Sequence, residues 1–212
     1  GDKKSIEKYT SEMSSGRDNS VLNNVTSSVS SSAANIAAAR MDTAPTGSVA
    51  SSGAIVASGD RNTGASSFLQ GFMTKGSDSS DKGYDTSSFG FVFGGDFSLD
   101  SMTAGAAFTF AKSDVEYKQY DQKLSAKTIG ASAYMSYNIA SRAFVQFSGG
   151  VFSTDVDDSA KRFNETEKSA YKITSYNFRA LTGFNLVLDE DTAMTVTPML
   201  GFVVDSNSIP KR

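Results

Sequence analysis

The chain has 212 residues and a formal net charge of -3, and it contains neither cysteine nor histidine. The slight negative charge argues against nucleic acid as a partner. Disulfide scaffolds, thiolate or imidazole metal sites and Ser/His/Asp hydrolases need the missing residue types. We therefore expect a protein without metal, cofactor or enzymatic activity.

Three polar segments precede the first strand signal. Residues 1–17 show no secretory signal sequence, so we interpret them as a linker or the tail of a preceding domain rather than as the natural start. Residues 18–41 place Val, Leu and Ile at roughly helical spacing among Ser, Asn, Thr and Ala. They predict either a partly disordered linker or a slender helix lying inside a narrow polar space. Residues 42–67, rich in Gly, Ser, Ala and Thr, are a connecting segment.

The most regular pattern lies in residues 89–118, FGFVFGGDFSLDSMTAGAAFTFAKSDVEYK. Aromatic side chains alternate with small or hydroxylated ones along two arms joined by a turn, which is the period of β-strands. The charges of the second arm are confined to the end of its strand. Aromatic rings on one face, small polar residues on the other and charges at the rims are typical of a strand that crosses a membrane as part of a barrel.

Similar alternation predicts five further strands, at residues 68–75, 128–137, 144–153, 171–188 and 193–203. Short turns alternate with longer polar loops, among them residues 154–168, which is the habit of outer-membrane barrels. The predicted fold is therefore all-β: a transmembrane antiparallel up-and-down β-barrel over residues 68–212, with the helix threaded through its pore. About seven strands are present, an odd number, and an open edge cannot lie in lipid. We expect that the chain lacks the remaining strands or that a partner supplies them.

The alternation assigns side chains to the two faces of this sheet. The set expected to face lipid comprises Phe89, Phe91, Phe93, Phe108, Phe110, Met135, Phe147, Tyr176, Phe178 and Phe202. The set expected to line the pore or to contact the helix comprises Asp96, Thr109, Ser132, Asn177, Arg179, Thr195 and Thr197. The polar side chains of the helix should then pack against the polar side chains on the inner face of the sheet.

Arg179 is the basic residue of the predicted pore. Its guanidinium is expected to hold helix carbonyl groups or a carboxylate such as Asp96. Because one residue of register decides the face, the alternative is that Arg179 lies at a rim in solvent.

In the hairpin of residues 89–118, a Gly-rich strand with a Gly-x-Asp ending is followed by a turn and a second strand, MTAGAAFTFAKSDVEYK, which is similar to the pattern L-x-x-G-x-A-F-x-Y-x-K-x-D-x-K-Y. This arrangement resembles the second and third strands of autotransporter (type V secretion) translocator domains. The matching positions are Asp96, Gly105, Phe108, Lys112, Asp114 and Tyr117. IGASAYMSYNIASRAFVQFSGGVF is similar to the following pair of strands, and TPMLGFVV resembles a later strand of that family.

The resemblance implies a twelve-stranded barrel in the bacterial outer membrane with a helix in its pore. Such a domain carries an N-terminal passenger to the cell surface while the barrel assembly machinery holds it, and the helix afterwards plugs the pore. Its partners are then outer-membrane lipid, that machinery and the passenger. Some relatives release the passenger by cyclisation of an asparagine, which makes Asn23 and Asn24 weak candidates for self-cleavage. As a dipeptide match they are more simply two polar helix residues.

Two other functions remain open from the sequence. One is a plain outer-membrane porin or structural barrel whose pore holds no helix. The other is a soluble secreted β-sandwich, a binding module in which the aromatic faces form the core.

Overall fold

A computed structural model describes residues 19–41, 55–58, 64–79, 83–99, 101–118, 122–140, 143–162, 165–189 and 194–208. The predicted linker of residues 1–17 lies outside these residues. The described elements are α2 (Asn19–Met41), β1 (Ile55–Ser58), β2 (Gly64–Ser77), β3 (Tyr84–Leu99), β4 (Met102–Tyr117), β5 (Gln122–Ala140), β6 (Ala143–Arg162), β7 (Glu165–Phe184), β8 (Leu186–Asp189), β9 (Met194–Val196) and β10 (Met199–Ser208).

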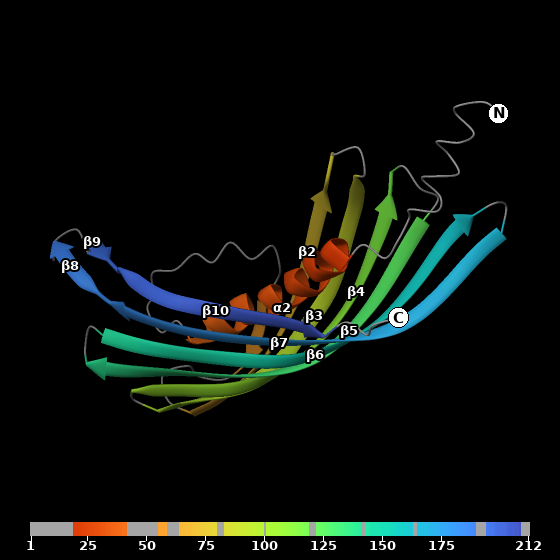
Figure 1. The fold of residues 1–212 in the computed structure, drawn as a ribbon. Helices are drawn as coiled ribbons and strands as arrows, with labels where there is room; N and C mark the ends of the chain where they lie inside the picture. The colour runs from red at the N-terminus through yellow and green to blue at the C-terminus, as the bar shows by residue number, and fades with distance from the viewer. Residues whose placement is uncertain are drawn as a thin grey trace.

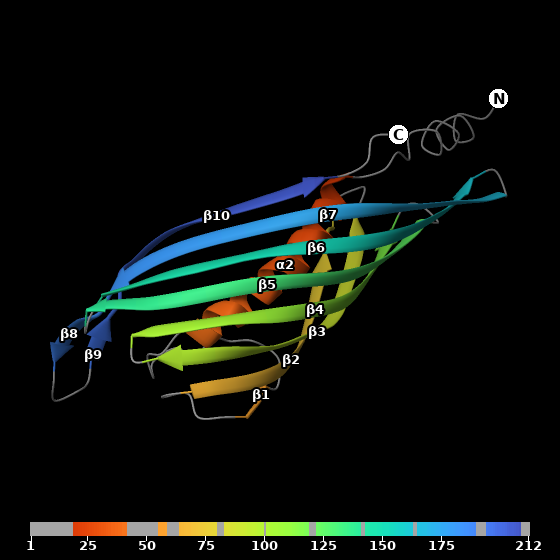
Figure 2. The ribbon, with the colours of Figure 1, turned by 90° about the horizontal axis from the view of Figure 1, so that it is seen from below.

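Eight of the strands form one antiparallel sheet in the order β1-β2-β3-β4-β5-β6-β7-β10. Neighbours along the chain are neighbours in the sheet, as in an up-and-down barrel. The seven predicted strands are present as β2 to β7 and β10. β1 adds a short edge strand within the segment predicted to be a connection. In the described part of the chain β1 and β10 lie at opposite edges, as Figure 2 shows.

The sheet curves strongly, and α2 lies along its concave face in contact with β2 to β7 (Figure 1). Among the described residues, no helix has the length and apolar character needed to cross a membrane. We name the two ends of the sheet by their connections. The β3–β4 rim is the end where β3 passes into β4 and β5 into β6. The β2–β3 rim is the opposite end.

The convex face of the sheet carries an exposed apolar band. All ten residues predicted to face lipid lie there, with exposed fractions between 38% for Met135 and 57% for Phe202. Their rings touch one another across strands, as in the stacked pair of Phe93 and Phe108 with centroids 5.5 Å apart. A β-sandwich would bury these rings in a shared core, so the structure contradicts that alternative.

The strands extend beyond this band, so the loops at the β2–β3 rim are shorter than predicted. Residues 154–168, expected to be a long loop, are mostly strand: β6 continues to Arg162 and β7 begins at Glu165. The alternation persists here, because Thr154 and Val156 are buried and Asp155 and Asp157 are exposed. Charged residues on the outward face conceal this strand pattern in the sequence.

The last two predicted strands are each divided at the β3–β4 rim. β7 ends at Phe184 and β8 begins at Leu186, while β9 and β10 are separated by Thr197 and Pro198. β8 and β9 pair only with each other, forming a hairpin beyond the main sheet. The break is physically reasonable, because proline lacks the N–H that a continuous ladder needs. Thr197 instead donates its hydroxyl hydrogen to the side chain of Asn185, at 2.8 Å.

Candidate functional site

The candidate site is the space between α2 and the concave face of the sheet. In the first part of α2, residues 19–32, Leu22 is the one strong helix former, and serine and threonine hydroxyls bond back to carbonyl groups one turn earlier. Thr26 Oγ1 donates to Leu22 O at 2.9 Å, and Ser32 Oγ donates to Ser28 O at 2.8 Å. These bonds satisfy the hydroxyls within the helix, so its small side chains can approach the wall closely.

An apolar stripe fixes which side of α2 faces the sheet. Toward the β2–β3 rim, the helix residues Val21, Leu22 and Val25 are buried in one cluster with wall residues Val115, Leu124, Ala126, Val156 and Ile173. Toward the β3–β4 rim, a second cluster joins helix residues Val29, Ala33, Ile36, Ala37 and Met41 to wall residues Phe68, Phe72, Val92, Ala107, Tyr134 and Phe152. The predicted contact of polar surface with polar surface is therefore wrong over much of the helix. A helix of this composition needs apolar burial to be stable, and the wall provides it.

Hydroxyl groups on the concave face accompany these clusters. Thr128 and Thr154 share a hydrogen bond of 2.9 Å between their side-chain oxygens, and Ser88 donates to Ser113 at 2.7 Å. Thr109 is fully buried on the same face. The interior of the curved sheet is thus mixed, with hydroxyl pairs alongside apolar contacts.

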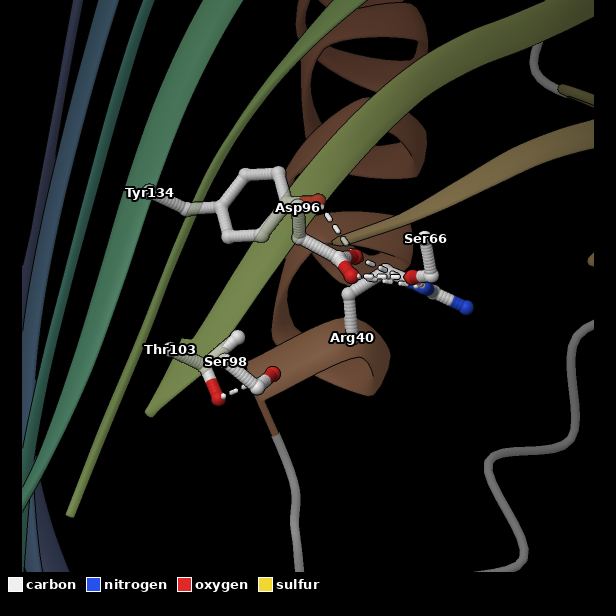
Figure 3. Close-up of polar contacts among 6 residues, drawn as sticks. All are labelled: Arg40, Ser66, Asp96, Ser98, Thr103 and Tyr134. Carbon is white, nitrogen blue, oxygen red and sulfur yellow. Dashed lines mark hydrogen bonds and ion pairs between the residues drawn. The ribbon is translucent and has the colours of Figure 1, made fainter. Parts of the chain in front are cut away.

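An ion pair joins the last turn of α2 to the wall. Arg40 Nε lies 2.6 Å from Asp96 Oδ2, and Arg40 Nη2 lies 2.9 Å from Asp96 Oδ1, so the guanidinium binds the carboxylate through both oxygens (Figure 3). The two side chains are only 2% and 4% exposed. A cation is also favourable at the carboxyl end of a helix, where the helix dipole is negative. Burial makes this pair costly to break from one side, because the remaining charge would have no partner.

Neighbouring side chains complete the binding of the carboxylate. Ser66 in β2 accepts a hydrogen bond from Arg40 Nη2 at 2.5 Å and donates to Asp96. Tyr134 in β5 donates its hydroxyl hydrogen to Asp96 Oδ2 at 3.0 Å, and the Arg40 guanidinium lies 4.8 Å from the centre of the Phe68 ring. The network therefore ties three strands to the helix, as Figure 3 shows for its polar members.

Tyr134 reaches Asp96 because the intervening strand has a glycine. Gly105 of β4 lies opposite Tyr134 in the register of the sheet. A β-carbon at Gly105 would lie 2.5 Å from the hydroxyl oxygen and from Cζ of Tyr134. Any larger residue there would push the ring away from the carboxylate.

Polar contacts also hold the other parts of the helix. Near the β2–β3 rim, Asn24 Nδ2 donates to the Tyr84 hydroxyl at 3.0 Å, and Asn207 Nδ2 donates to Asn23 Oδ1 at 3.1 Å. In the middle, Asn177 Nδ2 donates to the Ser30 carbonyl at 3.3 Å. The helix is thus contacted along its length, with its amino end at the β2–β3 rim and its carboxyl end at the β3–β4 rim.

The structure brings most of the predicted pore residues to this space. Asp96, Thr109, Ser132, Asn177 and Arg179 lie on the concave face. Thr195 and Thr197 do not join them, because the strand that was expected to carry them is divided. Thr195 belongs to β9, and Thr197 contacts Asn185 outside the main sheet.

Arg179 faces the helix rather than a solvent rim, but its partner is neither a helix carbonyl group nor the carboxylate of Asp96. Its Nη1 lies 3.5 Å from the side-chain oxygen of Asn35. Asp96 is already bound by Arg40, which was not among the residues predicted from the sequence. The sequence did contain a signal for this pair. Arg40 is the basic residue in the last turn of the helix, and Asp96 is an acidic residue among the small inward side chains of its strand.

The candidate cleavage pair, Asn23 and Asn24, lies in the second turn of α2. Both side chains are engaged, one with Asn207 and the other with Tyr84. Self-cleavage stays a prediction. Among the described residues, no group of three acidic side chains is arranged to hold a metal ion.

Comparison with known protein families places the chain in a family. The family model described as the autotransporter beta-domain matches residues 67–210, which is more than half of the chain. The chain matches no curated protein and no solved structure.

Proposed function

Because the chain belongs to the autotransporter beta-domain family, which implies a translocator in the bacterial outer membrane, we propose that it exports an N-terminal passenger and is afterwards plugged by α2. Its partners are outer-membrane lipid against the exposed aromatic band, the barrel assembly machinery during insertion, and the passenger itself. Translocation rather than catalysis is the activity of such a family.

The observation that carries this proposal is the position of α2 inside the curved sheet. The helix is contacted at its amino end by Tyr84, in its middle by Asn177 and at its carboxyl end by Asp96. A helix held in this way closes the space that an unfolded passenger crosses. A plain porin offers no role for these contacts, so we do not favour that alternative.

The orientation of α2 between the two rims supports export of the passenger toward the cell surface. At the β3–β4 rim, residues 100–101 separate β3 from β4 and residues 141–142 separate β5 from β6. At the β2–β3 rim, residues 78–83 separate β2 from β3 and residues 118–121 separate β4 from β5. The connections at residues 163–164 and 185–198 do not follow this difference between the rims. Turns of outer-membrane barrels are short on the periplasmic side and longer outside. The β2–β3 rim then faces the medium, and a passenger preceding Asn19 lies at the cell surface.

A reporter placed before residue 19 tests the proposal. Cells making the fusion are treated with protease, and a periplasmic protein of the same cells serves as the control for membrane integrity. We expect the reporter to be digested while the periplasmic control stays intact. A reporter that is digested only after lysis would contradict export.

A further inference from the structure

One row of side chains runs along the length of α2 at every fourth residue. Its members are all apolar and all buried against the concave face, and we call them the apolar row: Val21, Val25, Val29, Ala33, Ala37 and Met41. Residues four apart on a helix lie almost above one another, about 6 Å apart along its axis. A screw movement of α2 by one turn would therefore bring each member except the leading one onto a site that another apolar residue has left.

The apolar row alone thus leaves the position of α2 along the wall weakly specified. Movement toward the β2–β3 rim is the direction of export in the proposed function. One turn in that direction would bring Thr26 to the site of Leu22, and Arg40 to the site of Ile36. Thr26 is already buried, and its hydroxyl donates to Leu22 O at 2.9 Å within the helix. The hydroxyl would keep this bond in its new site, so Thr26 does not oppose the movement strongly.

Arg40 does oppose the movement, because it is the one charged residue of α2. The site of Ile36, which it would enter, lies in the apolar cluster nearer the β3–β4 rim. The guanidinium would also be displaced by about 6 Å along the wall. Its bonds to Asp96, which are 2.6 and 2.9 Å long in the resting position, would then be broken (Figure 3). Two buried charges would be left without partners, which is strongly destabilising.

Movement toward the β3–β4 rim is opposed by charges that precede the apolar row. One turn in that direction would bring Arg17 to the site of Val21, and Asp18 to the site of Leu22. Both sites lie in the apolar cluster nearer the β2–β3 rim. Burying charged side chains there is unfavourable. The inward direction is therefore limited by the sequence before α2, and the direction of export by the Arg40–Asp96 pair.

We propose that the Arg40–Asp96 pair sets the point at which α2 stops in the pore during export. Asp96, Ser66 and Tyr134 form the receiving site on three strands of the wall. Arg40 reaches this site at one position of the helix, as one buried polar residue fixes the register of helices whose apolar contacts repeat. Arg40 and Asp96 are thus positioning residues. Their stopping role rests on the proposed function, whereas the resting position of the helix does not.

Distances between two spin labels measure this resting position. The chain has no cysteine, so Asn23→Cys and Ser101→Cys provide the only thiols for labelling. Asn23 is exposed near the amino end of α2, and Ser101 lies in the turn at the β3–β4 rim, so the distance between the labels runs mainly along the helix. Pulsed electron paramagnetic resonance of the full chain in micelles should give one distance when Arg40 and Asp96 are both present.

The Arg40→Met/Asp96→Leu variant removes the pair without leaving an unpaired charge. A second distance, about 6 Å longer, should appear beside the native one, because residue 40 can then enter the apolar cluster. A single, unchanged distance in this variant would overturn the proposal, since the remaining contacts would then suffice to fix the helix. A role in stability alone likewise predicts a lower free energy of unfolding with an unchanged distance.

Arg179→Met is the matched control. It removes the other basic side chain that contacts the helix, whose Nη1 lies 3.5 Å from the side-chain oxygen of Asn35. The native distance alone should be found. A longer distance in this variant as well would contradict a special role of the Arg40–Asp96 pair, because loss of any polar contact would then release the helix.

The surface reporter separates failure of this inference from failure of the proposed function. The distances are measured on folded protein in micelles, so they test the position of α2 whether or not export occurs. A surface reporter together with a single distance in the Arg40→Met/Asp96→Leu variant would contradict the inference alone. A reporter that stays inside the cell, together with the second distance in that variant, would contradict export and with it the stopping role, while the resting position would stand.

Discussion

Arg40 and Asp96 lie 56 residues apart in the chain and form a buried bidentate ion pair between the helix and the wall. The pair lies at the end of α2 nearer the β3–β4 rim, where Ser66 and Tyr134 also bind the carboxylate. It is the most buried of the ion pairs found among the described residues. Its position makes it the main polar restraint on the carboxyl end of the helix.

Removing one member of this pair should cost more than replacing both. Asp96→Ala leaves a buried guanidinium without its counter-charge and should lower the free energy of unfolding by about 3–5 kcal/mol. Arg40→Met combined with Asp96→Leu should cost less than the sum of the single changes, because no charge is left unpaired. Urea titration of the protein in micelles measures both values. Additive losses would show that the two side chains do not act as a pair.

Gly105→Ala should displace Tyr134 and weaken the same network. The added β-carbon would lie 2.5 Å from the tyrosine hydroxyl oxygen, so the ring must move and its 3.0 Å bond to Asp96 is lost. We expect a loss of about 1–3 kcal/mol in unfolding free energy, as for other overpacked sites.

Gly71→Ala is the matched control for that change. The nearest atoms to its β-carbon belong to the Phe91 ring at 3.7 Å, an ordinary contact. Its stability should stay close to that of the wild type. If both alanine variants unfold alike, the close approach of Tyr134 to Gly105 has no special importance.

Cross-linking should report the contact at the amino end of the helix. The chain has no cysteine, so Asn24→Cys with Tyr84→Cys gives the only thiols. A short bifunctional maleimide added to outer membranes should join them, since the native side chains lie within hydrogen-bonding distance. Asn24→Cys with Ile139→Cys should not react in this way, because Ile139 lies on the outward face and is 60% exposed. Equal yields from the two pairs would argue against a helix that lies beside Tyr84 on the concave face.

Deleting residues 19–41 should raise the conductance of the protein in planar bilayers. The deletion removes a helix whose apolar and polar contacts fill the concave face. The Arg40→Met/Asp96→Leu variant keeps the helix and its apolar clusters and should conduct at the low level of the wild type. Equal conductance of the deleted and intact chains would show that α2 does not obstruct a pore.

The two faces of the sheet were predictable because side chains alternate with a period of two. All ten predicted outward residues lie on the convex face, and Asp96 and Arg179 both point toward the helix. The strand ends were less predictable, because charged outward residues such as Asp155 resemble a loop. The break coincides with Pro198, which is visible in the sequence, but alternation alone does not reveal that β8 and β9 pair with each other outside the main sheet.

The partners within the site could not be read from the sequence. Arg179 and Arg40 are both basic residues facing the same space, and only the position of each along the wall decides which one meets Asp96. The apolar clusters were also missed. Val115 and Ile173 occupy inward positions near strand ends, among polar residues, and only the structure shows that they pack against the helix.

Quenching of single tryptophans by brominated lipid tests the arrangement of the two faces most directly. The chain has no tryptophan, so Phe108→Trp and Phe72→Trp each introduce one probe. Phe108 is 52% exposed on the convex face, whereas Phe72 is 8% exposed beside the helix. We predict strong quenching of the probe at position 108 and little at position 72. Equal quenching, or stronger quenching at position 72, would contradict a sheet that faces lipid outside and holds α2 inside.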